Sequence, residues 1–583
     1  MSSLLKVAGL SVAFEGAKKV VDSVSFEVER GEIVALVGES GSGKTLAARS
    51  LMGLLPFGAE IVGGEALFSG VDLLRASETD RLAIRGARIG MIFQEPMTSL
   101  NPSMRIGDQM AEALKHHAGV SETEARTLCI EMLSRVRIAN PKWVLDRYPH
   151  QFSGGMRQRI MIASVMLLKP TLVLADEPTT ALDVLVQKEV LDLIVELARE
   201  AGSGVLLITH DLGLVAQYSH RIYVMRRGRV VEEGASASLL SAPKEDYTRT
   251  LLGALPRRGK NRNVDKSDNI LMSADDISVR FPGKRSLPWR KTEDVRPLNG
   301  VSMCIRRGET VAIVGESGSG KTTLARALLG LVPITSGTVY FDGIEISSLR
   351  LEELRDARRR IRIVFQDPFS ALDPRMRIGA IVMEGLRHSY DLSARERAQR
   401  VSRTLDEVGL GEGFASRFPH QLSGGQRQRV NIARALVADP DLIVADEPVS
   451  ALDVTVQAEI LNLLARLQSD RGFGCIFISH ALGVVEQVAD RVMVLYRGNI
   501  VETGSRDDIF DRPRHPYTCA LLRAAPRLNG DRANGYRLHP FPANQPPPPP
   551  GHDYAQLEGA AMSMGRLVEV SPGHSVACTS NGF

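Results

Sequence analysis

The octapeptide Gly-Glu-Ser-Gly-Ser-Gly-Lys-Thr occurs twice in this chain, at residues 38–45 and again at residues 315–322. A short apolar run, Ile33–Val37 in the first copy, leads into it, and a segment with helical spacing of apolar residues follows. Its glycines let successive backbone N–H groups turn inward around phosphate oxygens, and the following helix adds its positive end. The octapeptide therefore predicts two phosphate-binding loops, each between a strand and a helix.

The surrounding sequence repeats with these loops. Phe152-Ser-Gly-Gly-Met matches Leu422-Ser-Gly-Gly-Gln, and Ala175-Asp-Glu-Pro matches Ala445-Asp-Glu-Pro, both at an offset of 270 residues. Self-similarity over so long an offset indicates a tandem duplication rather than a solenoid. We expect a first domain at residues 1–255, a linker at 256–269, a second domain at 270–526 and a tail at 527–583.

The linker and the tail differ in composition from the two repeats. Residues 256–268 are rich in Arg, Lys, Asn and Asp without apolar periodicity, which predicts a solvated linker, with contact to anionic lipid as the alternative. The tail is rich in Asn, Gly and Pro and contains five consecutive prolines at 546–550. We expect a loose tail with a stiff polyproline spacer, and a ligand for a proline-binding domain is the alternative.

The overall composition excludes several classes of protein. With 44% hydrophobic residues the chain can bury several cores, so disorder is not its main state. The 72 basic and 68 acidic residues nearly balance, which argues against a nucleic-acid binder driven by charge. Five widely spaced cysteines fit isolated thiols in a reducing compartment. No apolar stretch approaches the ~18 residues of a membrane span, so we expect a soluble or peripheral protein.

Further apolar runs define the fold class. Residues 171–175 and 204–208 are short and wholly or mostly apolar, as expected of buried parallel strands, and the intervals between them suit helices. The sequence therefore predicts an α/β fold with a parallel sheet in each repeat.

Carboxylates at the end of one such strand complete a candidate phosphate site in each repeat. Asp176 and Glu177, and likewise Asp446 and Glu447, lie where open α/β sheets bind ligands. The lysines Lys44 and Lys321 suit the β- and γ-phosphates. The hydroxyls of Thr45 and Thr322, with the carboxylates of Asp176 and Asp446, suit Mg²⁺, and Glu177 and Glu447 suit the orientation of an attacking water.

On these motifs the chain resembles the ATP-binding cassette (ABC) ATPases over nearly all of residues 1–526, and the two Ser-Gly-Gly segments look like the family's signature loop. The resemblance implies two tandem cassettes, each with a RecA-like α/β core, an antiparallel β edge and a helical signature subdomain. It also implies ATP and Mg²⁺ as cofactors. Expected catalytic residues are Glu177, Glu447, the switch histidines His210 and His480, and the Q-loop residues Gln94 and Gln366, with Asp183 and Asp453 in the D-loops.

The same resemblance assigns the nucleotide-binding residues. Phe14 and Phe281 occupy positions from which an aromatic ring would stack on adenine, and a role in the core is the alternative. The two cassettes of the one chain are expected to pair head to tail, each phosphate loop facing the signature loop of the other. The binding residues are Gly38, Glu39, Ser40, Gly41, Ser42, Gly43, Lys44, Thr45, Gly315, Glu316, Ser317, Gly318, Ser319, Gly320, Lys321, Thr322, Ser153, Gly154, Gly155, Ser423, Gly424 and Gly425.

Two positions depart from the symmetry of the repeats. Met156 replaces the glutamine common at the end of the signature loop, and Ala481 follows His480 where Asp211 follows His210. The Lys, Asp, Glu and His residues are present in both copies, so we expect two hydrolytically competent sites.

A finer resemblance points to the energising subunits of dipeptide, oligopeptide and nickel importers, here fused into one chain. It rests on residues 94–102, 152–159, 366–374 and His515-Pro-Tyr-Thr518. It implies two membrane permeases and a solute-binding protein as partners, no nucleic acid, and a peripheral place on the cytoplasmic face of the inner membrane. Peptides are the first expectation for the solute; nickel, glutathione and opine-like solutes remain open.

Other features limit the alternatives. The tail has only Cys578 beyond Cys519, so no iron–sulfur cluster is expected there. The rival function is a soluble tandem ABC ATPase acting on ribosomes or nucleic acid. The short irregular linker and the lack of zinc-type cysteine clusters argue against it, and the paired Glu177 and Glu447 argue against a scaffold without turnover.

Overall fold

The computed structural model describes residues 3–15, 19–95, 99–180, 182–259, 269–283, 285–287, 290–291, 294–350, 353–387, 392–450, 452–531, 535–539, 541, 546–550, 552–555 and 565–580. The chain forms two compact units. Unit 1 contains residues 1–255, 453–455 and 526–540, and unit 2 contains residues 256–452, 456–525 and 541–583.

Unit 1 is built on a six-stranded sheet and a four-stranded sheet. The larger has the order β10-β9-β3-β8-β7-β6, parallel except for the β9–β10 pair, and the smaller is antiparallel with the order β2-β1-β4-β5. The strands are β1 (Leu5–Phe14), β2 (Lys19–Val28), β3 (Ile33–Val37), β4 (Ala59–Phe68), β5 (Val71–Asp72), β6 (Ile89–Ile92), β7 (Leu172–Asp176), β8 (Gly204–Ile208), β9 (Arg221–Arg226) and β10 (Arg229–Ala235).

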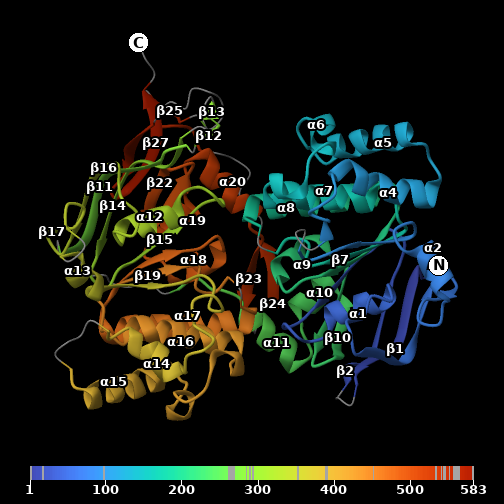
Figure 1. The fold of residues 1–583 in the computed structure, drawn as a ribbon, viewed down its shortest axis with the longest axis horizontal. Helices are drawn as coiled ribbons and strands as arrows, with labels where there is room; N and C mark the ends of the chain where they lie inside the picture. Colours follow the sequence, from blue (N-terminus) through green and yellow to red (C-terminus); the bar gives the residue numbers. More distant parts are fainter. Residues whose placement is uncertain are drawn as a thin grey trace. The chain divides into compact units, whose positions relative to one another are not determined.

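The helices of unit 1 include a separate group that follows β6 in the chain. Figure 1 shows α4 to α8 gathered on one side of this unit and β1 and β2 on another. The helices are α1 (Lys44–Leu51), α2 (Glu78–Ile84), α4 (Ile106–Ala118), α5 (Glu122–Arg135), α6 (Pro141–Leu145), α7 (Gly154–Met166), α8 (Val184–Ala201), α9 (Leu212–Tyr218), α10 (Ser236–Ser241) and α11 (Asp246–Gly253), with the 3-10 turn η1 (Pro149–Gln151).

The central strands of unit 1 are apolar because they lie in its hydrophobic core. Every residue of β3, β7 and β8 is buried, because helices or the second sheet cover both faces of a parallel sheet. One hydrophobic cluster joins this sheet to the α4–α8 group, and another joins its opposite face to the antiparallel sheet and α1. The predicted α/β core, antiparallel edge and helical subdomain are therefore confirmed.

Unit 2 repeats this plan. Its antiparallel sheet has the order β14-β11-β16-β17, and its main sheet runs β18-β19-β20-β15-β21-β22-β27-β25, with β26 paired to β27. The strands are β11 (Ile270–Phe281), β12 (Arg285–Leu287), β13 (Arg290–Lys291), β14 (Val295–Arg306), β15 (Thr310–Val314), β16 (Ser336–Phe341), β17 (Ile344–Glu345), β18 (Ile361–Val364), β19 (Leu442–Asp446), β20 (Gly474–Ile478), β21 (Arg491–Tyr496) and β22 (Asn499–Ser505).

The helices of unit 2 also form a group beside the sheet. In Figure 1, α14 to α17 lie together on the side away from β11, β14 and β16. The helices are α12 (Lys321–Leu328), α13 (Leu354–Arg360), α14 (Ile378–Glu384), α15 (Ala394–Glu407), α16 (Gly424–Leu436), α17 (Val454–Arg471), α18 (Leu482–Val488), α19 (Arg506–Asp511) and α20 (Pro516–Ala524), with 3-10 turns η2 (Glu412–Phe414) and η3 (Pro419–Gln421). Among the described residues, no helix is long and apolar enough to cross a membrane.

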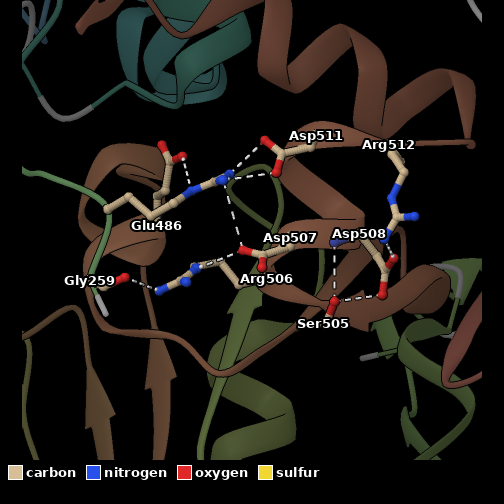
Figure 2. Close-up of polar contacts among 9 residues, drawn as sticks. Gly259, Glu486, Ser505, Arg506, Asp507, Asp508, Asp511 and Arg512 are labelled. Atoms are coloured by element: carbon tan, nitrogen blue, oxygen red, sulfur yellow. Dashed lines mark hydrogen bonds and ion pairs between the residues drawn. The ribbon is translucent and has the colours of Figure 1, made fainter. Parts of the chain in front are cut away.

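The start of the linker is held in place, which corrects the expectation that all of it is solvated. The Arg258 guanidinium pairs with Glu486 at 3.1 Å and Asp511 at 2.6 Å, and Arg506 donates to the Gly259 carbonyl at 2.8 Å. Figure 2 shows the acceptors on α18 and α19 converging on this segment. Acidic residues far away in the chain neutralise the linker arginine, so local composition did not reveal the anchor. Residues 260–268 lie outside the described residues.

The tail is not loose as expected, because it forms strands. They are β23 (Arg527–Asp531), β24 (Gly535–His539), β25 (His552–Tyr554), β26 (Arg566–Ser571) and β27 (His574–Ser580). β26 and β27 form a hairpin, and β27 pairs with β22, where Nε2 of the buried His574 lies 2.8 Å from the Glu502 carboxylate. The alternation of apolar and polar residues over 568–571 and the Pro572-Gly573 turn were the available strand signals. The prolines at 546–550 lie outside any strand or helix.

Candidate functional site

The two phosphate loops connect β3 to α1 and β15 to α12, as predicted. Their first glycines allow close packing: a Cβ on Gly38 would lie 2.2 Å from the Met225 carbonyl oxygen, and one on Gly315 would lie 2.0 Å from that of Leu495. Gly320, the last glycine of the second loop, has φ 108°, and a Cβ added to it would lie similarly close to a backbone carbonyl oxygen. No larger residue fits these positions, which explains the glycine pattern.

The loop lysines are buried and folded back onto their own loops. Lys44 Nζ donates to the carbonyls of Gly38 and Glu39, both at 2.8 Å, and Lys321 Nζ donates to those of Gly315 and Glu316 at 2.8 and 2.7 Å. Burial lowers the pKa of Lys44 from its ordinary value, although the nearby Glu177 carboxylate opposes this. Each lysine Nζ is thus held at the loop by backbone carbonyls, which phosphate oxygens can replace.

Each strand-end aspartate contacts the threonine of its loop. Thr45 Oγ1 donates to Asp176 Oδ1 at 2.9 Å, and Thr322 Oγ1 lies 3.5 Å from Asp446 Oδ1. Burial raises the pKa of both aspartates above the ordinary value. Asp176 Oδ2 is buried and has no hydrogen-bond partner. The threonine hydroxyl and the aspartate carboxylate of each unit are oxygen ligands of the kind that a hard divalent cation prefers.

The glutamate after the strand is the centre of a polar network in unit 1. Oε2 of Glu177 accepts from Gln94 Nε2 at 2.8 Å and from Thr180 Oγ1 at 2.9 Å, and its Oε1 lies 3.2 Å from His210 Nδ1. Burial acts to raise the pKa of Glu177, but the hydrogen bond and charge of His210 outweigh it, so the pKa lies below the ordinary value. The bond to Glu177 raises the pKa of His210.

Unit 2 reproduces this network. Gln366 Nε2 donates to Glu447 Oε2 at 2.8 Å, and His480 Nδ1 lies 3.1 Å from Oε1. Both glutamates have left-handed backbones, with φ 44° at Glu177 and φ 48° at Glu447. Such conformations are costly for residues other than glycine and concentrate at functional sites. The structure thus brings together the predicted Lys, Asp, Glu, Gln and His in each unit.

The signature segments begin helices α7 and α16. Ser153 and Ser423 are the N-caps, and their hydroxyls accept from the backbone N–H of Met156 and Gln426. Gln426 also accepts from the Ser423 N–H at 3.1 Å, which completes a capping box, whereas Met156 packs against the core instead. Glycine at the first helical positions leaves this end of each helix open. Both segments are suited to bind an anion.

Comparison with known proteins identifies the family. A model described as "ABC transporter" matches residues 21–180 and 298–450, and one described as "Oligopeptide/dipeptide transporter, C-terminal region" matches residues 231–282 and 501–556. The chain belongs to the ABC transporter family. The predicted ABC-type ATPase with an oligopeptide-transporter C-terminal region is thereby confirmed.

Curated relatives match almost the whole length of the chain. The peptidoglycan transport ATP-binding protein YejF of Agrobacterium fabrum is 47% identical over 90% of this chain and 96% of its own. The glutathione import ATP-binding protein GsiA is 44% identical in Pectobacterium atrosepticum, over 91% of this chain and 90% of its own, and 42% identical in Salmonella paratyphi A, over 98% and 96%. This ABC protein therefore has the double-cassette length of importer ATP-binding subunits.

The departure from symmetry at Asp211 and Ala481 has a local structural effect in this ABC subunit. Asp211 caps α9 by accepting from the N–H groups of Gly213 at 2.8 Å and Leu214 at 3.2 Å, whereas Ala481 gives α18 no side-chain cap.

The two phenylalanines expected at adenine lie at strand ends: Phe14 ends β1 and is half-buried, and Phe281 ends β11 and is exposed. Their stacking on adenine remains a prediction.

Sequence reasoning missed two contributors to the cassette sites. Thr180, three residues after Glu177, donates to its carboxylate, and its counterpart Ser450 bonds instead to the Glu447 backbone carbonyl. The hydroxyls of Tyr247 and Tyr517 accept from the backbone of the phosphate loops. The recurrence of Tyr-Thr at a spacing of 270 residues was the one signal for the tyrosines.

Proposed function

We propose that this chain hydrolyses ATP at both cassettes and uses the energy to drive the import of short peptides or peptide-like solutes. The observation that carries the proposal is the duplicated network in which Glu177 and Glu447 each accept from a glutamine at 2.8 Å and approach a histidine within 3.2 Å. A carboxylate held in this way can orient a water for attack on the γ-phosphate.

Magnesium fits the residues next to each glutamate. Asp176 has one buried oxygen without a hydrogen-bond partner, and a buried carboxylate of raised pKa gains from a cation. Thr45 with Asp176, and Thr322 with Asp446, would hold Mg²⁺, which supplies charge neutralisation to the transferring phosphoryl group. Lys44 and Lys321 would turn from the loop carbonyls to the phosphates.

Membership of the ABC transporter family supports coupling of ATP hydrolysis to transport. In our proposal ATP brings the two cassettes together, with the signature loops at Ser153 and Ser423 completing the opposite nucleotide sites. Release of phosphate then lets them separate, and two membrane permeases respond to the change. The subunit acts at the cytoplasmic face of the inner membrane, and a solute-binding protein delivers the solute.

The relatives support the solute class. Those compared above are named for glutathione import and for peptidoglycan transport, and one family model describes an oligopeptide/dipeptide transporter region. Glutathione is a tripeptide, and peptidoglycan carries short peptide stems. Peptide-like solutes are the chemistry that these names share, so we place this chain with them.

A purification tests the proposal. We would tag the chain, solubilise membranes gently with Mg²⁺–ATP, and identify the proteins that co-purify. Two polytopic permeases in equal amounts support it, and uptake of labelled glutathione, a dipeptide and a muropeptide in cells with and without the chain assigns the solute. Recovery only from the cytosol with ribosomal proteins or nucleic acid would reject importer function in favour of the soluble alternative.

A further inference from the structure

In both units a tyrosine of the C-terminal region reaches the phosphate loop. The backbone N–H of Glu39 donates to the Tyr247 hydroxyl at 3.3 Å, and that of Glu316 donates to the Tyr517 hydroxyl at 2.9 Å. These tyrosines follow their loops by about 200 residues and are less than 8% exposed. The same contact is present in both units although much of the sequence around it differs, which indicates a functional feature of the site.

A glutamate carboxylate, half-buried in unit 1 and fully buried in unit 2, fixes the turn that precedes each tyrosine helix. The Glu232 carboxylate accepts from the backbone N–H groups of residues 244 and 245, just before α11. The Glu502 carboxylate accepts from those of residues 514 and 515, just before α20, and is fully buried. The turn sequences differ, Lys-Glu-Asp-Tyr against Arg-His-Pro-Tyr, yet the glutamate and the tyrosine occur in both. The shared geometry therefore serves to place the tyrosine.

Each tyrosine ring is also held from the side. The Arg226 guanidinium lies 4.7 Å from the centre of the Tyr247 ring, and the Tyr496 ring lies 4.4 Å from that of Tyr517. Cation–π and ring–ring contacts of this kind restrict the ring, so the hydroxyl stays in place without relying on the loop.

The second residue of the loop is consequently held through both sides of its own backbone. In unit 1 the Glu39 N–H bonds to Tyr247 while its carbonyl accepts from Lys44 Nζ at 2.8 Å, and unit 2 repeats this with Glu316, Tyr517 and Lys321. When the lysine turns to a phosphate it gives up the carbonyl. The bond from the loop N–H to the tyrosine hydroxyl does not involve the lysine, so it can persist after the lysine turns away.

We propose that Tyr247 and Tyr517 are positioning residues for ATP binding, which hold the start of each phosphate loop in its binding conformation. The inference extends the proposed function by giving the oligopeptide-transporter C-terminal region a role in the nucleotide site. It concerns nucleotide binding by the chain alone, so it stands or fails independently of the permeases and of the transported solute.

Tyrosine-to-phenylalanine variants test the proposal, since they remove only the hydroxyl. Y247F is made in a Lys321→Ala background and Y517F in a Lys44→Ala background, so that one loop reports in each protein. Tyr223→Phe in the Lys321→Ala background is the matched control, because its hydroxyl accepts from the Glu27 N–H at 3.2 Å in β2 rather than from a loop. The probe is a fluorescent ATP analogue with Mg²⁺, with melting temperatures recorded for each nucleotide-free protein.

We expect Y247F and Y517F each to weaken nucleotide binding by about 2- to 12-fold, the effect of one uncharged hydrogen bond. In the full chain with both lysines, KM for ATP should rise while kcat stays nearly constant, as expected when uniform binding is lost. Unchanged binding in both variants would overturn the proposal. So would an equal loss in Y223F, or a loss that merely follows the fall in melting temperature. Because each unit carries the test separately, one variant that fails to fold leaves the other decisive.

Discussion

Asp211 and Ala481 occupy equivalent helix caps, and exchanging them tests how far a single side chain stabilises the helix next to the switch histidine. The cap backbones nearly coincide, with φ −89° and ψ 102° at Asp211 and φ −83° and ψ 97° at Ala481. Asp211 accepts two backbone N–H groups of α9, whereas α18 receives no side-chain bond at its start. An aspartate at 481 can therefore reach the same two N–H groups in unit 2.

Loss of an N-cap side chain costs ~0.5–2 kcal/mol, and the two bonds at Asp211 place D211A away from the low end of that range, at ~1–2 kcal/mol. If α9 opens locally, its amides should exchange about 5- to 30-fold faster with deuterium. A481D should slow exchange in α18 by a smaller factor, because Ala481 is partly packed against the core and a carboxylate there is partly desolvated.

Hydrogen exchange followed by mass spectrometry measures this directly in peptides that cover residues 212–218 and 482–488. Peptides from α8 and α17 serve as internal controls. The backbone N–H groups of residues 211 and 481 bond to the hydroxyls of Thr209 and Ser479, and the substitutions leave these bonds in place, so the exchange of these two amides should not change. Unchanged exchange of residues 212–218 in D211A, with the helix still folded, would refute the capping argument.

Three further variants probe the loops, the C-terminal helix and the linker. Gly38→Ala should lower the free energy of unfolding by about 3 kcal/mol or more, because its Cβ would overlap the Met225 carbonyl. Gly41 has φ 76° and open space around it, so Gly41→Ala should cost only ~1–2 kcal/mol, and equal losses of the two variants in urea titrations would contradict this. Burial lowers the pKa of His515 to about 4, below its unfolded value near 6.5, so the wild-type protein should lose stability as pH falls from 6.5 to 4, by at most ~3 kcal/mol. His515→Asn should lose less stability over this range, and identical pH profiles of the two proteins would exclude His515 as the cause. Arg258→Ala should destabilise unit 2 by ~0.5–1 kcal/mol at low salt and less at 1 M salt, and a salt-independent effect in thermal melts would rule out the ion pairs with Glu486 and Asp511 as its cause.

The sequence predicted the parts of the molecule that short motifs determine. Glycines that allow close backbone contact, a buried strand ending in Asp176-Glu177, and the repeat itself were enough for the core fold and for the Lys, Asp, Glu and His of each site. These residues lie at strand ends or in turns, where the position in the chain determines the position in space.

Features that depend on distant partners were beyond the sequence. Arg258 bonds to acids more than 200 residues away, and the hydroxyl of Tyr517 meets a loop about 200 residues earlier. The strands of the tail were hidden by its high content of Pro, Gly and Asn, and β27 is stabilised by pairing with β22 and by the His574–Glu502 contact. Composition describes a segment alone and does not include such contacts.

The central claim is that both cassettes hydrolyse ATP, and turnover by the purified chain tests it most directly. We would measure Mg²⁺–ATP hydrolysis for the wild type, Glu177→Gln, Glu447→Gln and the double variant, after confirming that each still binds nucleotide. The duplicated networks predict that either single variant loses a large part of the activity and that the double variant loses it all. Full activity in one single variant, with none in the other, would show that only one site turns over and contradict the account.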